Sequence, residues 1–207
     1  MKNKFFKIGR KHIGENKKVF IIAEIGLNHN GSAAQCAKLI DQATLVGADA
    51  VKLQVSDPNA SYAKSTDSYQ VFKKNSLKEN EILNLKKYAD KKKIIFFFTP
   101  GDFKSLNLVK KFKIEAVKIS SGLMTNIPLV TEASKIGVPM IISTGMCFKK
   151  EIIKTFQIAK KYNKSGIALL KCTSLYPASD NTINLLAIKN FINTFKIPIG
   201  YSDHTKD

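Results

Sequence analysis

The feature that most constrains the fold is an alternation of short apolar, β-branched runs with longer stretches that have the spacing of amphipathic helices. We predict seven strands, at residues 19–23, 50–53, 94–98, 116–119, 139–142, 167–170 and 197–200. We predict six helices between them, at residues 33–46, 77–91, 103–112, 127–136, 149–162 and 184–194. Strands that alternate with helices form parallel sheets, and nearly continuous apolar strands are typical of sheets covered on both faces. The sequence therefore predicts an α/β fold.

The position of the polar residues distinguishes a closed barrel from an open doubly wound sheet. Every predicted strand has polar side chains at its carboxyl end, such as Glu24 on the first strand and His204 after the seventh. A (β/α)8 barrel builds its active site from the carboxyl ends of all its strands, whereas an open sheet needs polar ends only near a switch point. We therefore expect a (β/α)8 TIM barrel. Because 207 residues are fewer than the roughly 250 of a typical barrel, we expect it to be truncated after strand 7.

Two segments fall outside the strand–helix alternation. Residues 1–18 contain two short runs that predict an N-terminal hairpin, which we interpret as a plug for the bottom of the barrel, and residues 19–207 form the incomplete barrel domain. Residues 55–76 read as one long irregular excursion after a strand, and such loops often carry function.

Composition excludes several classes of protein. The net charge is +18, but Arg10 is the only arginine among 34 basic residues, and base readout and bidentate phosphate contacts favour arginine. We therefore expect a solvated basic surface and no nucleic-acid partner. No apolar run approaches the roughly 20 residues of a membrane span, so we expect no membrane association and no signal peptide. The three cysteines are far apart and form no CxxC motif, which indicates reduced thiols and a cytoplasmic location.

Two lysines interrupt predicted apolar strands close to their polar ends. Lys52 and Lys118 would be costly to bury without a counter-charge. One interpretation is structural, a salt bridge across the barrel to a carboxylate such as Glu24. The other is a cradle for an anionic substrate, because lysine combined with small hydroxyl donors suits phosphate or carboxylate. The hydroxyl donors at the same ends of the strands are Thr99, Ser121, Ser143 and Ser202.

The three histidines have different contexts. His12 lies in the predicted hairpin, where we expect it on the surface. His29 belongs to the segment Asn-His-Asn-Gly after the first strand, where a role in the turn competes with a role in substrate binding. His204 follows the seventh strand, and neutral imidazole in that position is a good transition-metal ligand. A metal site needs more than this one ligand.

Seven motifs, taken together and in order, resemble the N-acetylneuraminate (sialic acid) synthase family. They occupy residues 21–31, 47–54, 98–102, 117–126, 142–146, 172–177 and 200–205, among them Cys-Thr-Ser-Leu-Tyr-Pro and Gly-Tyr-Ser-Asp-His-Thr. The family includes synthases for sialic, legionaminic and pseudaminic acids and spore-coat polysaccharide proteins. The resemblance implies condensation of phosphoenolpyruvate with N-acetylmannosamine or a diacetamido hexose to a nine-carbon 2-keto acid and phosphate. It also implies a divalent metal, commonly Mn²⁺ with Mg²⁺ or Co²⁺ as alternatives, a carboxy-terminal antifreeze-like domain, and a domain-swapped homodimer for the full-length protein.

The resemblance also implies roles for individual residues. His204 resembles one of two metal-binding histidines, Glu24 the acid/base carboxylate near the sugar, and Tyr176 and Asp203 contacts to the sugar. The residues that resemble the phosphoenolpyruvate site are Lys52, Thr99, Lys118, Ser121, Ser143 and Ser202. The chain departs from the family pattern at Gly101, where an aromatic residue is common, and at Ser174, where some members have asparagine. These departures leave the identity of the sugar open.

Two alternatives belong to other functional classes. A Schiff-base aldolase is also a barrel and needs no metal, and Lys118 or Lys171 would then be the nucleophile. A non-catalytic basic binding protein is the second alternative, and it would bind nucleic acid with a steep dependence on salt.

Overall fold

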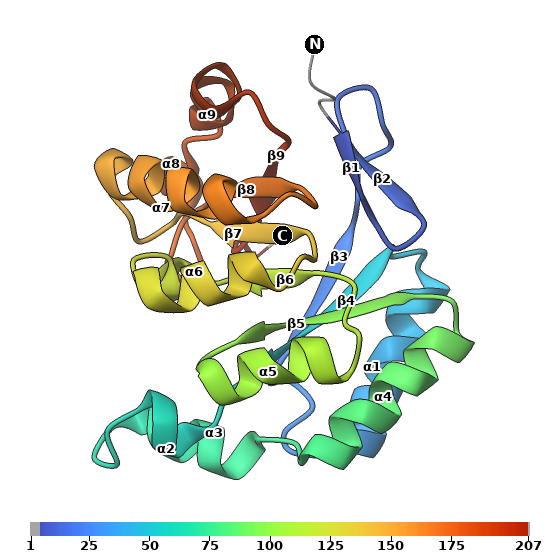
Figure 1. Cartoon of the computed structure of the whole chain (residues 1–207). Helices are drawn as coiled ribbons and strands as arrows, with labels where there is room; N and C mark the ends of the chain where they lie inside the picture. Colours follow the sequence, from blue (N-terminus) through green and yellow to red (C-terminus); the bar gives the residue numbers. More distant parts are fainter. Residues whose placement is uncertain (1–4, 207) are drawn as a thin grey trace. The chain divides into compact units, whose positions relative to one another are not determined.

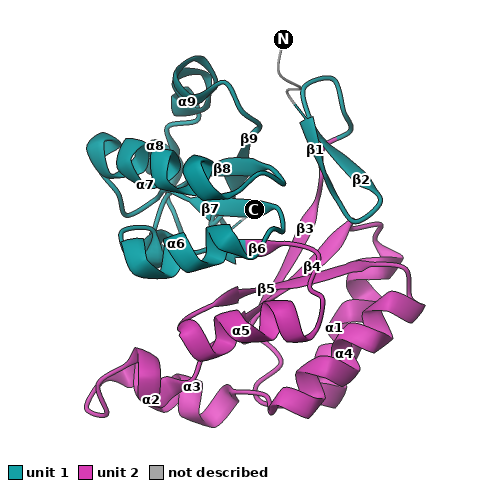
Figure 2. Ribbon diagram, in the orientation of Figure 1, with its two compact units in different colours: residues 1–18, 118–207 teal, residues 19–117 magenta. Residues whose placement is uncertain are grey.

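The structure is a computed structural model that describes residues 5–206, and the chain divides into two compact units (Figure 2). One unit, drawn in magenta, is Val19–Val117. The other, drawn in teal, combines Met1–Lys18 with Lys118–Asp207. The boundary between residues 117 and 118 lies within a single short strand, β6 (Val117–Ile119).

The unit formed by residues 19–117 contains the first three strands of a parallel sheet (Figure 1). Its strands are β3 (Ile22–Gly26), β4 (Ala50–Val55) and β5 (Ile95–Pro100). Its helices are α1 (Ala33–Leu45), α2 (Pro58–Ser61), α3 (Asp67–Asn75), α4 (Glu79–Lys91) and α5 (Phe103–Lys111). Helices α1 and α4 pack against each other along the sheet. Strand β5 is buried along its whole length, as the run Phe96-Phe97-Phe98 predicts for a strand covered on both faces.

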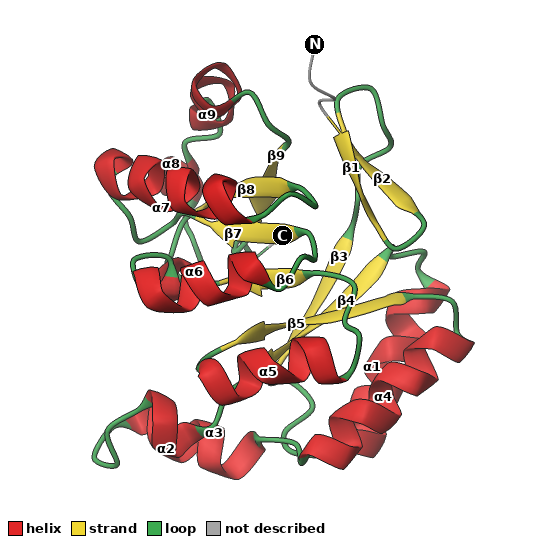
Figure 3. Cartoon of the chain, in the orientation of Figure 1, coloured by secondary structure: helices red, strands yellow, loops and turns green. Residues whose placement is uncertain are grey.

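The second unit contains an antiparallel hairpin and the later parallel strands (Figure 3). The hairpin pairs β1 (Phe5–Ile8) with β2 (Lys11–Gly14). The parallel strands are β7 (Met140–Ser143), β8 (Ile167–Cys172) and β9 (Ile199–Ser202). The helices are the 3-10 helix η1 (Ser121–Leu123), α6 (Ile127–Lys135), α7 (Lys149–Tyr162), α8 (Asp180–Ile183) and α9 (Ala187–Phe195).

The strand order confirms the predicted α/β architecture. Strands β3 to β9 are hydrogen-bonded in the order in which they occur in the sequence, and each connection between them contains a helix. A strand order that follows the sequence throughout is typical of (β/α) barrels. In a doubly wound sheet the strand order reverses at a switch point. None of the helices within residues 5–206 has the length and apolar character of a membrane span.

Helix ends follow the chemistry of the sequence. The side chains of Ser32, Thr66 and Asn126 accept backbone hydrogen bonds at the starts of α1, α3 and α6, which satisfies amides that lack a partner within the helix. Gly47 and Gly137 follow α1 and α6 with φ of +80° and +86°, a conformation that glycine adopts without strain.

Three sequence predictions are wrong in detail. The predicted strand 19–23 begins three residues later as β3, and Val19 and Ile21 are 81% and 56% exposed. The segment 55–76 is not irregular, because it contains helices α2 and α3. The helix predicted from residue 184 begins at Ala187, and the short helix α8 before it was not predicted.

Candidate functional site

The first group of predicted residues meets on three adjacent strands, β3, β4 and β5. Lys52 is 1% exposed, and its ammonium donates to Thr99 Oγ1 at 3.0 Å and pairs with Glu24 Oε1 at 2.9 Å. The side chain of Glu24 is 50% exposed. We call Glu24, Lys52 and Thr99 the Lys52 cluster. The ion pair that the structural interpretation predicts is therefore present, and it places a half-exposed carboxylate against a buried cation.

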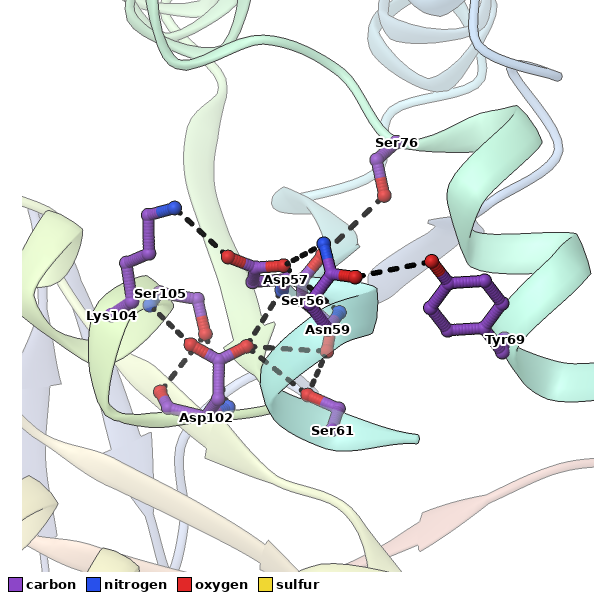
Figure 4. A network of polar contacts seen from close by, with 9 residues as sticks. All are labelled: Ser56, Asp57, Asn59, Ser61, Tyr69, Ser76, Asp102, Lys104 and Ser105. Atoms are coloured by element: carbon purple, nitrogen blue, oxygen red, sulfur yellow. Dashed lines mark hydrogen bonds and ion pairs between the residues drawn. The ribbon is translucent and has the colours of Figure 1, made fainter. Parts of the chain in front are cut away.

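A second network lies directly after Thr99 and joins the ends of β4 and β5 (Figure 4). The buried carboxylate of Asp102 accepts hydrogen bonds from the amide of Asp57 at 2.7 Å, from the amide of Ser105 at 2.8 Å, and from the hydroxyls of Ser56 and Ser61 at 3.2 Å each. The network therefore ties α2 to the first turn of α5. We call it the Asp102 network.

The absence of a side chain at Gly101 allows the segment after β5 to lie close to Ser56, which follows β4. A Cβ atom at residue 101 would overlap the side chain of Ser56. The glycine that departs from the family pattern is thus matched by a serine that fills the adjacent space.

In the other unit, two predicted substrate-binding residues are buried at strand ends. Lys118 on β6 is 9% exposed. Ser143 ends β7 and is 2% exposed, and its hydroxyl is the only fully buried side-chain polar atom within residues 5–206 without a hydrogen-bond partner. Buried polar groups nearly always have partners, so this hydroxyl is available to a bound ligand or water.

Ser121 is held by two neighbours that the sequence interpretation did not assign. The amide of Gly145 donates to Ser121 Oγ at 3.0 Å, and Cys172 Sγ lies 3.1 Å from the same oxygen. The thiol is a weak hydrogen-bonding group, so its contact leaves the hydroxyl proton of Ser121 available to a stronger acceptor.

His204 lies among hydrogen-bonding groups from the ends of β8 and β9. Its Nδ1 is 2.6 Å from the carbonyl oxygen of Thr173, and its Nε2 is 3.2 Å from the hydroxyl of Tyr176 and 3.4 Å from that of Ser202. The ring of Tyr176 also stacks on the imidazole, with 4.1 Å between centroids. We call Thr173, Tyr176, Ser202 and His204 the His204 cluster. It brings together three of the predicted site residues.

Asp203 is exposed and is held by its own turn. Its Oδ1 accepts hydrogen bonds from the amide of Thr205 at 2.9 Å and from the hydroxyl of Tyr201 at 3.2 Å. The hydrogen bond from the Thr205 amide lowers the pKa of Asp203, which keeps the carboxylate ionised. Its predicted contact with a sugar stays a prediction.

The other histidines have structural environments. His12 is exposed on β2, as predicted. His29 is 1% exposed, and its Nδ1 accepts a hydrogen bond from the amide of Gly31 at 3.2 Å, so it stabilises the turn after β3. Burial lowers the pKa of His29. The imidazole also lines a small pocket with Gln54, Ser56 and Ser76.

Sequence reasoning missed several residues that shape these clusters. Asp102 is an aspartate three residues before a serine at a helix start, which is a recognisable capping pattern. The contribution of Thr173 to His204 is a backbone carbonyl, which has no residue-type signature. Lys171 pairs with Tyr201 in the β8–β9 register, so its side chain projects from the opposite face of the sheet to the side chains of Cys172 and Ser202.

The strand order, the hairpin and the polar carboxyl ends define the chain as a (β/α)-barrel protein. The model of the NeuB family matches residues 39–207, and the chain belongs to this family. A sialic acid synthetase from Leptospira borgpetersenii, solved with citrate, is 37% identical and superposes with a TM-score of 0.94 over 98% of this chain and 70% of its own. A DAHP synthase from Thermotoga maritima, at 16% identity and a TM-score of 0.75, shares the fold.

Curated relatives extend the comparison. The uncharacterized protein MJ1065 of Methanocaldococcus jannaschii is 41% identical over 96% of this chain and 59% of its own length. The N,N'-diacetyllegionaminic acid synthase of Legionella pneumophila is 35% identical over 95% of this chain and 60% of its own length. The chain thus spans about three fifths of the length of these relatives.

Proposed function

We propose that the protein carrying this chain is a sugar-acid synthase that condenses phosphoenolpyruvate with an N-acetylated amino sugar, either N-acetylmannosamine or a diacetamido hexose. The observation that carries the proposal is the Lys52 cluster, which combines a buried cation, a hydroxyl and a half-exposed carboxylate on three adjacent strands. Membership of the NeuB family supports the reaction class, because several relatives are named as sialic, legionaminic or pseudaminic acid synthases.

Each unit supplies groups suited to an anion. Lys52 with Thr99 does so in one unit, and Lys118 with the unpartnered hydroxyl of Ser143 does so in the other. Ammonium groups and hydroxyl donors stabilise phosphate and carboxylate most strongly where water is excluded. The sequence motifs assign these groups, together with Ser121 and Ser202, to phosphoenolpyruvate, and the proposal adopts that assignment.

The proposal includes a divalent metal, Mn²⁺ with Mg²⁺ or Co²⁺ as alternatives, and His204 fits the role of one ligand. Its Nδ1 donates to the Thr173 carbonyl, which leaves the lone pair of Nε2 for a partner. A group of three or more His, Cys, Asp or Glu side chains around one point does not occur within residues 5–206, so His204 would be one contributor to the site. Such a metal, when bound, would polarise the aldehyde oxygen of the open-chain sugar.

The chemistry of the proposal divides among the residues of the chain. The methylene carbon C3 of phosphoenolpyruvate forms a bond to the aldehyde carbon, and the aldehyde oxygen takes up a proton to become a hydroxyl. Water adds to C2, the carbon that carries the phosphate ester oxygen, and cleavage of the C2–O bond to that oxygen releases phosphate and leaves the 2-keto acid. Glu24 would orient or deprotonate the water, because its carboxylate is half exposed. Lys52 and Lys118 would neutralise the phosphate and carboxylate charges. Tyr176 and Asp203 would contact the sugar.

The direct test is phosphate release from phosphoenolpyruvate with each sugar, with and without Mn²⁺, by the protein that carries this chain. His204→Ala should lower metal affinity and abolish turnover while phosphoenolpyruvate still binds. Full activity of His204→Ala after chelation would refute the metal-assisted reaction. A covalent adduct at Lys118 after borohydride treatment with pyruvate would instead support a Schiff-base aldolase.

A further inference from the structure

Thr173 connects His204 to a buried lysine. Its carbonyl oxygen lies 2.6 Å from His204 Nδ1, and its hydroxyl oxygen accepts a hydrogen bond from Lys171 Nζ at 2.8 Å. The same hydroxyl donates to the carbonyl of Thr182 at 3.1 Å. One residue therefore contacts the imidazole through its backbone and two other segments through its side chain.

The contact with Thr173 determines the tautomer of His204. A carbonyl oxygen only accepts hydrogen bonds, so Nδ1 must carry the proton. In the neutral imidazole Nε2 then holds a lone pair. That atom faces the hydroxyls of Tyr176 and Ser202, both of which can donate to it.

The direction of the hydrogen bonds at the Thr173 side chain is fixed in the same way. An ammonium group has donors and no acceptor, so Lys171 can only donate to Thr173 Oγ1. The Thr173 hydroxyl proton is then directed to the carbonyl of Thr182. Lys171, Thr173 and Thr182 form a chain of hydrogen bonds with a single direction, which holds the start of the loop after β8.

The location of Lys171 indicates that it holds Thr173 in place. It is 9% exposed, and burying an ammonium is costly unless its hydrogen bonds are used. In the β8–β9 register it lies on the side of Tyr201, whereas Cys172 lies on the side of Ser202. Its hydrogen bond is to Thr173, so it acts on the His204 imidazole through Thr173.

We propose that Lys171 and Thr173 are positioning residues for His204. They hold the Thr173 carbonyl where it fixes the Nδ1-protonated tautomer and presents the Nε2 lone pair beside Tyr176 and Ser202. The use of that lone pair for a metal rests on the proposed function, but the tautomer itself does not. The proposal also gives Lys171 a role other than that of a Schiff-base nucleophile.

The test compares Thr173→Val, Thr173→Ser and Lys171→Met with the wild-type protein. Valine keeps the shape of threonine and removes the hydroxyl, serine keeps the hydroxyl, and methionine keeps the apolar stem of lysine without its donors. The readout is the ¹⁵N NMR spectrum of the His204 ring near pH 8, which distinguishes a protonated from an unprotonated nitrogen at Nδ1 and Nε2. Assignment is simple because the chain has three histidines.

We expect the wild type and Thr173→Ser to hold His204 with the proton on Nδ1. Thr173→Val and Lys171→Met should lower the ratio of the Nδ1-protonated to the Nε2-protonated form by about threefold to tenfold, the effect of one net hydrogen bond. Two results would overturn the proposal: a wild-type ring protonated on Nε2, or an unchanged ratio in both folded variants. If Thr173→Val fails to fold, Lys171→Met decides.

A titration with Mn²⁺ alone separates this inference from the proposed function. Loss of a partner that orients a metal-binding histidine typically weakens metal affinity by about 10- to 100-fold. Thr173→Val keeps the carbonyl and removes only its support, so it should bind Mn²⁺ about threefold to tenfold more weakly than Thr173→Ser. If the wild type binds no Mn²⁺, the metal role in the proposed function fails, and the NMR comparison still decides whether Lys171 and Thr173 position His204.

Discussion

Lys52 and Glu24 form an ion pair between a buried and a half-exposed group, which gives the two partners different freedom. Lys52 is 1% exposed, and its ammonium also donates to Thr99, so the position of the ammonium is fixed. Glu24 can exchange hydrogen bonds with solvent or substrate while it remains the counter-ion of Lys52. The ion pair can therefore be both a structural salt bridge and part of a catalytic site. Kinetic measurements on a variant of Glu24 distinguish a purely structural role from a catalytic one.

Glu24→Gln is the substitution that separates them. Glutamine keeps the shape and an acceptor for Lys52 but removes the charge and the basicity. We expect binding of phosphoenolpyruvate and metal to persist while the chemical step slows by about 10²- to 10⁴-fold, the usual contribution of a general acid or base. Single-turnover kinetics would measure this loss. A rate within a factor of a few of wild type would reduce Glu24 to a salt-bridge partner.

His29 should make stability depend on pH. Burial lowers its pKa in the folded protein, and Nδ1 can accept from Gly31 only when it is unprotonated. The unfolded chain therefore binds the proton first as pH falls through about 6.5, and the free energy of unfolding decreases by up to about 1.4 kcal/mol per pH unit below that point. Urea unfolding between pH 5 and pH 8 measures the slope.

The matched control for this prediction is the exposed His12. His29→Gln should flatten the slope between pH 5 and pH 6.5, whereas His12→Gln should leave it as in the wild type. Equal slopes for the wild type and His29→Gln would show that other groups cause the dependence.

At the scale of secondary structure, elements with strong apolar patterns were predictable and weakly patterned ones were not. Helix α7 was predicted with its observed bounds, whereas α2 has four residues and α3 buries only Tyr69, so neither has an apolar stripe to detect. The start of β3 was misplaced because Val19 and Ile21 are apolar yet exposed. The contacts of the Lys52 cluster were predictable because its residues lie on neighbouring parallel strands. The contact of the Thr173 carbonyl with His204 was not predictable, because a backbone group has no residue-type signature.

The Asp102 network links two elements and should contribute measurably to stability. Asp102→Asn exchanges one acceptor oxygen for an NH₂ donor, which faces the amide of Asp57 and the hydroxyls of Ser56 and Ser61. Loss of a buried, charge-assisted hydrogen bond should lower the free energy of unfolding by about 2–3 kcal/mol. Chemical denaturation measures it.

Lys104→Met supplies the control for the Asp102 prediction. Lys104 pairs with Asp57 at 2.8 Å, and its side chain is 77% exposed. Solvent and salt weaken such a pair, so its loss should lower the free energy of unfolding much less than Asp102→Asn does. If both variants lose the same stability, the buried carboxylate is not what joins α2 to α5.

At the scale of the whole chain, the net charge of +18 should attract anions from a distance, among them phosphoenolpyruvate in the proposed function. We expect kcat/KM for phosphoenolpyruvate to fall several-fold between about 10 and 150 mM salt, because the Debye length shortens from about 30 to about 8 Å, while kcat changes little. Steady-state kinetics at fixed metal concentration measures both. Tight, salt-dependent binding of duplex DNA without phosphate release would instead favour a basic binding protein.

Gly101 and Ser56 occupy one shared space, and this restricts how the two positions can diverge over evolution. A side chain at residue 101 has room only if the side chain at residue 56 is removed or turned away. Either single change passes through an overpacked or an underpacked intermediate, and both are destabilising. Among descendants of this sequence the two positions should therefore change together, so that a larger residue 101 is found with a smaller residue 56.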